Sequence, residues 1–331
     1  MRSFSLVLAS AAALAGPVAA DPLRDAAAEF FGPLPTTAPE IESNPANPEK
    51  LALGRALYFD ARLSATGQFS CNTCNTCHTL AGSGDDDLAT PIGLDGQAGL
   101  RNTSTILNAA LNESHFWDGR EVDLAVQGDG PIKAGLAMLN TPEAIVAVLN
   151  ADPGYPTMFA AAFPGEAEAV THDNTARAIE VYAATLITPG PFDAWLGGDD
   201  GALSETEKAG LQMFMDRGCS FCHYGPNLGG AGYYPLGLVV LPGADLQAAD
   251  EVAGAAAADP DAEEFTFRTA PLRNIALTAP YFHSGKVSDL SQAVAIMAEA
   301  QLGSPIPAEE VAGIVAFLNS LTGTLPDSAA P

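Results

Sequence analysis

The chain has 331 residues and a formal net charge of −26, because 40 acidic residues face only 14 lysines and arginines. This balance excludes nucleic acids and anionic membranes as partners that would be bound by charge. A basic redox partner could be steered to such a surface, although an acidic coat that serves only solubility explains the charge equally well.

The first 20 residues have the composition of a secretory signal. Arg2 precedes an apolar run from Leu6 to Ala20, which ends with small residues where cleavage is expected. The run is too short for a membrane anchor, and no later run is long enough to cross a bilayer. The sequence therefore predicts a periplasmic protein without a membrane span, whose mature chain begins at Asp21.

Helical periodicity occurs on both sides of a stretch rich in proline and glycine. The apolar spacing predicts helices over 48–60, 141–149, 173–186, 204–216 and 307–321. Between the third and the fourth of these, the breaks from Pro189 to Gly198 predict an inter-domain linker. The segment 253–264 is Ala-rich and then acidic, which predicts a surface excursion.

Two Cys-x-x-Cys-His strings carry the chemistry, and their residues are Cys74, Cys77 and His78, then Cys219, Cys222 and His223. Thiols at this spacing can form thioethers to one porphyrin, and the adjacent histidine can ligate its iron. A single copy could be a thiol redox pair, but two copies in an exported chain predict two covalently bound c-type haems. The fifth cysteine, Cys71, is a spare thiol that could compete during attachment.

The second half of the chain repeats the plan of the first. A helix with a Gly-x-x-x-aromatic spacing precedes each haem motif, with Gly54 and Tyr58 in one copy and Gly210 and Phe214 in the other. A further helix closes each half. We therefore predict a mainly α fold with two cytochrome c-like haem domains in tandem and long loops. After the signal peptide at 1–20, the domains are predicted at 21–190 and 191–331.

Across nearly the whole mature length, the chain resembles the bacterial di-haem cytochrome c peroxidases. The strings that carry the resemblance are Arg62-Leu63-Ser64, Arg101-Asn102, Phe116-Trp117-Asp118-Gly119-Arg120, Gly130-Pro131-Ile132, Gly225-Pro226-Asn227-Leu228-Gly229-Gly230, Ala270-Pro271-Leu272-Arg273-Asn274, Pro280-Tyr281-Phe282-His283-Ser284-Gly285, Ala295-Ile296-Met297 and Gln301-Leu302-Gly303. The related MauG enzymes, which mature methylamine dehydrogenase by oxidising tryptophans, share the architecture.

The resemblance implies that the C-terminal haem transfers electrons and that His223 and Met297 hold its iron. Thioether ligation raises a haem potential, which suits electron acceptance from a small cytochrome c or a cupredoxin. Core packing is the alternative role for such a methionine. The resemblance also makes Trp117 an electron relay between the haems, although a tryptophan there would also serve the core.

The resemblance further implies one calcium ion between the haems. Its ligands would be Asn102 and the backbone carbonyls of Thr278 and Pro280, and oxygen ligands suit this hard cation. Both a monomer and a homodimer remain open.

The resemblance places the reaction with hydrogen peroxide at the haem of His78, where this chain departs from the family. Leu94 replaces a removable distal histidine and cannot ligate iron, so the sixth position is expected to be open. Ala137 replaces the distal glutamate that would move the proton during O–O cleavage. Loss of such an acid–base group costs ~10²–10⁴ in rate.

Other side chains near this haem could supply part of the missing chemistry. Gln127 matches a distal-pocket position but cannot transfer protons as a glutamate does. His115 could substitute as the acid–base group, and Asp95 and Asp129 are weaker candidates.

These features lead to one main hypothesis and two alternatives. The main hypothesis is a periplasmic peroxidase that reduces hydrogen peroxide to water with electrons from a small donor protein. The first alternative is a non-catalytic di-haem electron-transfer or redox-sensing cytochrome, favoured by Leu94 and Ala137. The second is a MauG-like oxidase of a partner protein. Met297 argues against it, because the resemblance gives that branch a tyrosine at this position.

Overall fold

The computed structural model describes residues 21–65, 73–133, 138, 140–243, 246–248 and 265–329. Four predictions lie outside the described residues: the signal peptide at 1–20, the spare thiol of Cys71, the replacement at Ala137 and the excursion at 253–264. No helix in the described part of the chain is both long and apolar enough to cross a membrane.

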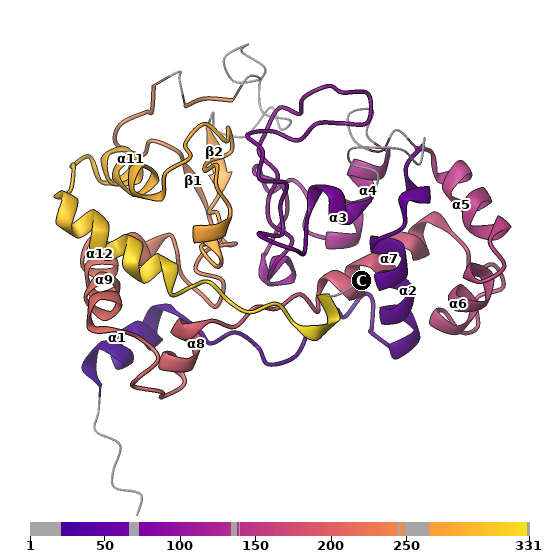
Figure 1. Cartoon of the computed structure of the whole chain (residues 1–331), viewed down its shortest axis with the longest axis horizontal. Helices are drawn as coiled ribbons and strands as arrows, with labels where there is room; N and C mark the ends of the chain where they lie inside the picture. Colours follow the sequence, from indigo (N-terminus) through magenta and orange to yellow (C-terminus); the bar gives the residue numbers. More distant parts are fainter. Residues whose placement is uncertain are drawn as a thin grey trace, which may run out of the picture.

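The fold is mainly α, as predicted, with one two-stranded sheet (Figure 1). The helices are α1 Pro22–Phe30, α2 Pro48–Tyr58, α3 Cys74–Cys77, α4 Leu124–Lys133, α5 Pro142–Ala151, α6 Tyr155–Ala162, α7 His172–Ala183, α8 Pro191–Leu196, α9 Glu205–Asp216, α11 Leu290–Leu302 and α12 Ala308–Asn319. Strands β1 Tyr233–Pro235 and β2 Thr266–Arg268 pair antiparallel, with Tyr234 opposite Phe267. All five predicted helices are confirmed, as α2, α5, α7, α9 and α12.

In the first half, α2 and α7 cross at close range. A Cβ on Gly54 would lie 1.9 Å from the carbonyl oxygen of Ala178 and 3.0 Å from Cβ of Tyr182, so only glycine permits this approach. One turn later, the ring of Tyr58 lies 5.2 Å from that of Tyr182. This crossing supports the segment that enters the first haem motif.

The second half repeats the crossing with α9 and α12. A Cβ on Gly210 would lie 1.9 Å from the carbonyl oxygen of Gly313 and 3.1 Å from Cβ of Phe317. The ring of Phe214 then lies 5.4 Å from that of Phe317. The predicted Gly-x-x-x-aromatic repeat therefore corresponds to the same helix–helix packing arrangement in both halves.

The predicted linker from Pro189 to Gly198 is not an open connection, because it contains α8. Pro191 occupies the first turn, where a missing N–H costs nothing, and the Asp193 carboxylate accepts the Gly190 N–H at 2.8 Å. Phe192 and Trp195 are fully buried in the core of the second half. The prolines and glycines predict a break in the chain, whereas here Gly190, Pro191 and Gly197 start and end a short helix that buries two aromatic side chains.

The two ends of the described chain pack on opposite halves (Figure 1). Phe31, directly after α1, is buried against Phe192 and Phe214 of the second half. At the other end, Leu325 and Ala329 pack in a cluster with Tyr58 and other residues of the first half. The boundary at residue 190 stays a prediction, and each end of the chain crosses it.

Candidate functional site

Both haem motifs form a single helical turn. The N–H of His78 donates to the carbonyl oxygen of Cys74 at 2.9 Å, and the N–H of His223 donates to that of Cys219 at the same distance. This turn brings the two cysteines of a motif to one side and sets the histidine directly beside them. The local geometry is therefore the same at the two predicted attachment sites.

His223 is buried and held in one orientation. Its Nδ1 lies 3.3 Å from the carbonyl oxygen of Leu228, which leaves Nε2 available as a ligand. Burial lowers the pKa of His223 to about 4, so the ring is neutral at neutral pH, as metal ligation requires. Burial also raises the pKa of the Cys219 thiol to about 11 and that of Cys222.

His78 is also neutral at neutral pH. Burial lowers its pKa, and backbone groups of Gly84 and Ser104 and the charge of Asp86 only partly oppose this. The hydroxyl of Tyr58 donates to the backbone carbonyl of His78 at 2.6 Å. A contact of this kind fixes the backbone from which the imidazole projects.

The cysteines of the first motif differ from each other. Cys74 carries a free thiol, and burial raises its pKa to about 12. Cys77 is disulfide-bonded in this structure. A sulfur in a disulfide cannot form a thioether, so haem attachment at Cys77 requires reduction first.

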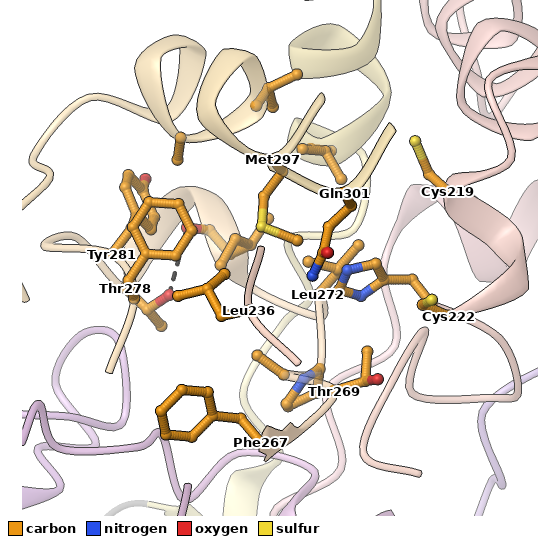
Figure 2. Close-up of a pocket in the computed structure, with 18 of the residues that line it drawn as sticks. Cys219, Cys222, Leu236, Phe267, Thr269, Leu272, Thr278, Tyr281, Met297 and Gln301 are labelled. Atoms are coloured by element: carbon orange, nitrogen blue, oxygen red, sulfur yellow. Dashed lines mark hydrogen bonds between the residues drawn. The ribbon is translucent and has the colours of Figure 1, made fainter. Parts of the chain in front are cut away.

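A cavity lined mainly by the second half brings Met297 of α11 to the same space as His223, Cys219 and Cys222. Figure 2 shows the Met297 side chain and those of Cys219 and Cys222 around this one cavity, on different segments of the chain. Apolar side chains form much of the remaining wall, including Leu236, Leu272, Val294, Ile306, Ile314 and Leu318. An apolar space between a neutral imidazole and a thioether fits a haem.

The residues of the predicted calcium site and the predicted relay line the same cavity. Asn102, Thr278, Pro280 and Trp117 all contribute to its wall. The indole N–H of Trp117 donates to the carbonyl oxygen of Asn102 at 2.8 Å. This hydrogen bond would thus connect the predicted relay, Trp117, to Asn102 of the predicted calcium site.

His283, which has no role predicted from the sequence, continues the aromatic wall from Trp117. Its ring centroid lies 6.1 Å from that of Trp117, edge to face, and 4.3 Å from that of Phe267, stacked. The carbonyl oxygen of His283 accepts the N–H of Asn102 at 2.8 Å. The string Tyr281-Phe282-His283 is one of those that carry the family resemblance. It does not predict the ring contact of His283 with Trp117, because the two residues are far apart in sequence.

The distal candidates of the first half differ in their surroundings. Gln127 lies on α4, and Asp95 is exposed in a turn where it accepts the N–H and side-chain amide of Gln97. Asp129 is engaged by His172, the first residue of α7.

His115 is buried, and burial together with the charge of Arg268 lowers its pKa to about 4. A group with so low a pKa is a weak base at neutral pH.

Comparison with known proteins gives the family. Residues 48–201 match the model of the di-haem cytochrome c peroxidases. The chain is 46% identical to cytochrome c551 peroxidase of Pseudomonas aeruginosa, over 97% of this chain and 92% of the relative. The chain belongs to the di-haem cytochrome c peroxidase family.

Other members of this family and related proteins match over slightly shorter lengths. Cytochrome c551 peroxidase of Nitrosomonas europaea is 40% identical, over 87% of this chain and 84% of the relative. The methylamine utilization protein MauG of Methylorubrum extorquens is 32% identical, over 77% and 70%. Among solved structures, a MauG-like protein associated with microbial copper homeostasis has a TM-score of 0.73 at 27% identity, covering 90% of this chain and 96% of its own.

Membership of a di-haem family implies two c-type haems, and the donor set of this chain fits them. Each motif supplies a neutral histidine that follows the attachment cysteines directly. The second site also offers a largely apolar cavity whose lining includes the Met297 thioether. Across the described residues, no three His, Cys, Asp or Glu side chains are grouped as a separate metal site.

Proposed function

We propose that this chain is a periplasmic di-haem cytochrome c peroxidase. It would reduce hydrogen peroxide with two electrons and two protons to two molecules of water. The electrons would come from a small c-type cytochrome or a cupredoxin. The observation that carries the proposal is the cavity shared by His223 and Met297. The high sequence identity of this chain to named peroxidases supports it.

Within the proposal, this chain's residues have distinct tasks. Cys219 and Cys222 tether one haem, whose iron His223 and Met297 ligate. The bound groups supply the iron for accepting electrons and reducing peroxide. Trp117, at the wall of the cavity, shortens the path between the two halves.

At the other haem, Cys74 and Cys77 form the tether and His78 ligates the iron. The calcium ion would be held by Asn102 and the carbonyl oxygens of Thr278 and Pro280. We retain the division into domains at 21–190 and 191–331 as part of the proposal, with export by the segment 1–20.

At the haem of His78, Leu94 would offer no ligand to the iron, so no activating reduction would be needed before peroxide binds. Gln127 would offer a side-chain amide as a hydrogen-bond donor to the substrate. The low pKa of His115 weakens its claim to replace the glutamate, because a neutral imidazole of that kind holds a proton poorly at neutral pH. Slow but measurable turnover is therefore expected.

The competing function is a di-haem electron carrier or redox sensor without peroxide turnover, and the replacements Leu94 and Ala137 favour it. The oxidase function is disfavoured by Met297, for the reason given above.

The deciding experiment measures peroxide-dependent oxidation of a reduced small cytochrome c by the purified two-haem protein, without prior reduction. Turnover supports the peroxidase with an open site. Absence of turnover both before and after reduction, with electron exchange retained, would establish the carrier instead.

A further inference from the structure

Arg268, at the end of β2, is a buried cation on the wall of the cavity that contains Met297 and His223. Only 5% of its surface is exposed. Its backbone N–H donates to the carbonyl oxygen of Trp117 at 2.9 Å, and Nη1 donates to that of Thr269 at 3.2 Å. Its Nε is buried and has no hydrogen-bond partner among the described residues.

No carboxylate of the described residues balances this charge. Arg268 takes part in none of the ion pairs formed in the described part of the chain. Removing a cation from water is costly unless an anion and good hydrogen bonds replace the solvent. An arginine cannot escape this cost by losing its proton.

A second buried arginine of the same half shows how the chain normally meets this need. Arg273 donates through two nitrogens to the two carboxylate oxygens of Asp193, at 2.6 and 2.8 Å. Its third donor, Nε, reaches the carbonyl oxygen of Pro226 at 3.0 Å. Arg268 has a comparable burial and lacks such a carboxylate, although it faces a cavity where a ligand could bring one.

We propose that Arg268 binds a propionate carboxylate of the haem attached at Cys219 and Cys222. The proposal rests on the proposed di-haem function. The planar guanidinium suits a carboxylate because it can donate two parallel hydrogen bonds, and Nε is one of the donors that form such a fork. The ligand thus supplies the anion that Asp193 supplies to Arg273.

This contact has an electrostatic consequence for the haem. Reduction adds one electron, and a nearby cation favours the state with the added electron. A paired Arg268 also cancels the negative charge of the propionate, which otherwise favours the oxidised state. Arg268 is therefore a positioning residue that raises the reduction potential of the His223/Met297 haem and ties its propionate edge to the backbone of Trp117.

The test compares Arg268→Met, Arg268→Gln and Arg268→Lys in the two-haem protein by reductive titration at neutral pH. The two neutral variants are expected to lower the equilibrium constant for reducing this haem about tenfold, which is 59 mV for one electron. Arg268→Lys keeps the charge and should retain most of the potential. Lys208→Met is the matched control, since it removes one charge from the exposed face of α9, where Lys208 pairs with Glu205.

Resonance Raman spectroscopy reports the contact directly, because the propionate bending band depends on its hydrogen bonds. The band should shift in all three Arg268 variants, including Arg268→Lys, and stay unchanged in Lys208→Met. If the neutral variants fail to retain haem, the band of Arg268→Lys decides. An unchanged band, or potentials equal to that of Lys208→Met, would overturn the proposal.

The same samples separate this inference from the proposed function. A shifted band in a protein that lacks peroxide turnover would contradict the peroxidase while supporting the propionate contact. Turnover with an unshifted band would support the peroxidase and contradict the contact.

Discussion

At the crossing of α2 and α7, the backbone of Gly54 lies against the carbonyl of Ala178, and at the crossing of α9 and α12, Gly210 lies against Gly313. The same glycine contact thus precedes both haem motifs. After the motifs, the halves carry different side chains at equivalent places. Comparing them separates what a haem-binding half needs from what gives each half its own chemistry.

The loops that follow the motifs also repeat. Asn108 and Asn274 are both left-handed, with φ of 59° and 61°. Their N–H groups donate to the carbonyl oxygens of Leu186 and Leu321, at 2.9 and 3.1 Å. Both side-chain amides donate to the hydroxyl of Thr188, at 2.8 Å each. The two repeats therefore meet at one buried residue, which links the halves.

The repeat continues to the residues between the two sites. Phe116 and Phe282 both have positive φ, of 62° and 67°, and each lies within a small antiparallel bridge. The next residues are Trp117 and His283, whose rings contact each other. The equivalent positions 117 and 283 of the two halves thus contact each other, and only the first of them is a tryptophan.

Helices α4 and α11, which occupy equivalent places in the two halves, show the most informative difference. Asp123 accepts backbone N–H groups at the start of α4, and Asp289 does so at the start of α11. Pro131 is as far along α4 as Met297 is along α11. A proline ring has no atom that ligates iron. The shared scaffold therefore offers a ligand in one half and an apolar ring in the other.

Substitutions at Met297 and Pro131 should have the largest effects on the two haems. Met297→Ala removes the thioether and should lower the potential of the His223 haem by on the order of 200 mV, within the ~0.8 V that axial ligands cover. Pro131→Met should supply a ligand to the His78 haem, giving a low-spin iron and loss of peroxide turnover. Reductive titration and near-infrared spectra measure both changes. A His78 haem that stays high-spin in Pro131→Met would refute the equivalence.

The helix crossings provide the next test. Gly54→Ala and Gly210→Ala each place a Cβ 1.9 Å from a carbonyl oxygen, so the helices must separate. The free energy of unfolding of the two-haem protein should fall by about 2–3 kcal/mol in each variant. Gly82→Ala is the control, because no atom lies within 4 Å of its added Cβ. Denaturant titration measures all three, and a loss in only one half would show that the crossings are not equivalent.

Much of this comparison could be predicted from the sequence, because covalent chemistry and close packing leave local patterns. The spacing of Cys219, Cys222 and His223 is the one that attachment of a c-type haem requires, and the spacing of Gly54 and Tyr58 corresponds to one helical turn. These signals need no knowledge of the partner segment.

The remainder depends on contacts between distant residues or on how one local signal competes with another. The ring contact of Trp117 with His283 joins two loops, and neither loop specifies it alone. The proline and glycines around α8 predicted a linker, and only the burial of Phe192 and Trp195 shows why a helix forms there. The lack of a carboxylate beside Arg268 is visible only once the cavity is known.

Asp85 is a buried carboxyl near the first motif, and it leads to a prediction about the pH dependence of stability. Burial raises its pKa to about 6. The folded state therefore holds the proton more tightly than the unfolded chain, whose aspartates titrate near ~3.9. Stability should fall as pH rises from ~4 to ~6, and the full penalty persists above that range.

Asp85→Asn should remove this slope and keep the acceptor for the Ser83 hydroxyl. At pH 7.5 the variant should be more stable than the parent by about 1 kcal/mol after allowance for solvent screening, and equal to it near pH ~4. Denaturant titrations across this range measure the difference. Asp95→Asn, at an exposed turn, should leave the profile unchanged. An unaltered slope in Asp85→Asn would assign the pH dependence to another group.

The smallest expected effect concerns the aromatic position that precedes each motif. Tyr58 donates its hydroxyl to the carbonyl of His78 at 2.6 Å, whereas the ring of Phe214 lies 6.3 Å from that of His223 and has no hydroxyl. Tyr58→Phe should lower the free energy of unfolding by about 1 kcal/mol, because the half-buried carbonyl of His78 loses its donor. Phe214→Tyr is the reciprocal variant, and it should also destabilise, since its new hydroxyl enters an apolar core. If Phe214→Tyr instead stabilised the protein, the second half would contain an acceptor equivalent to the His78 carbonyl, and the two halves would differ less than their side chains indicate.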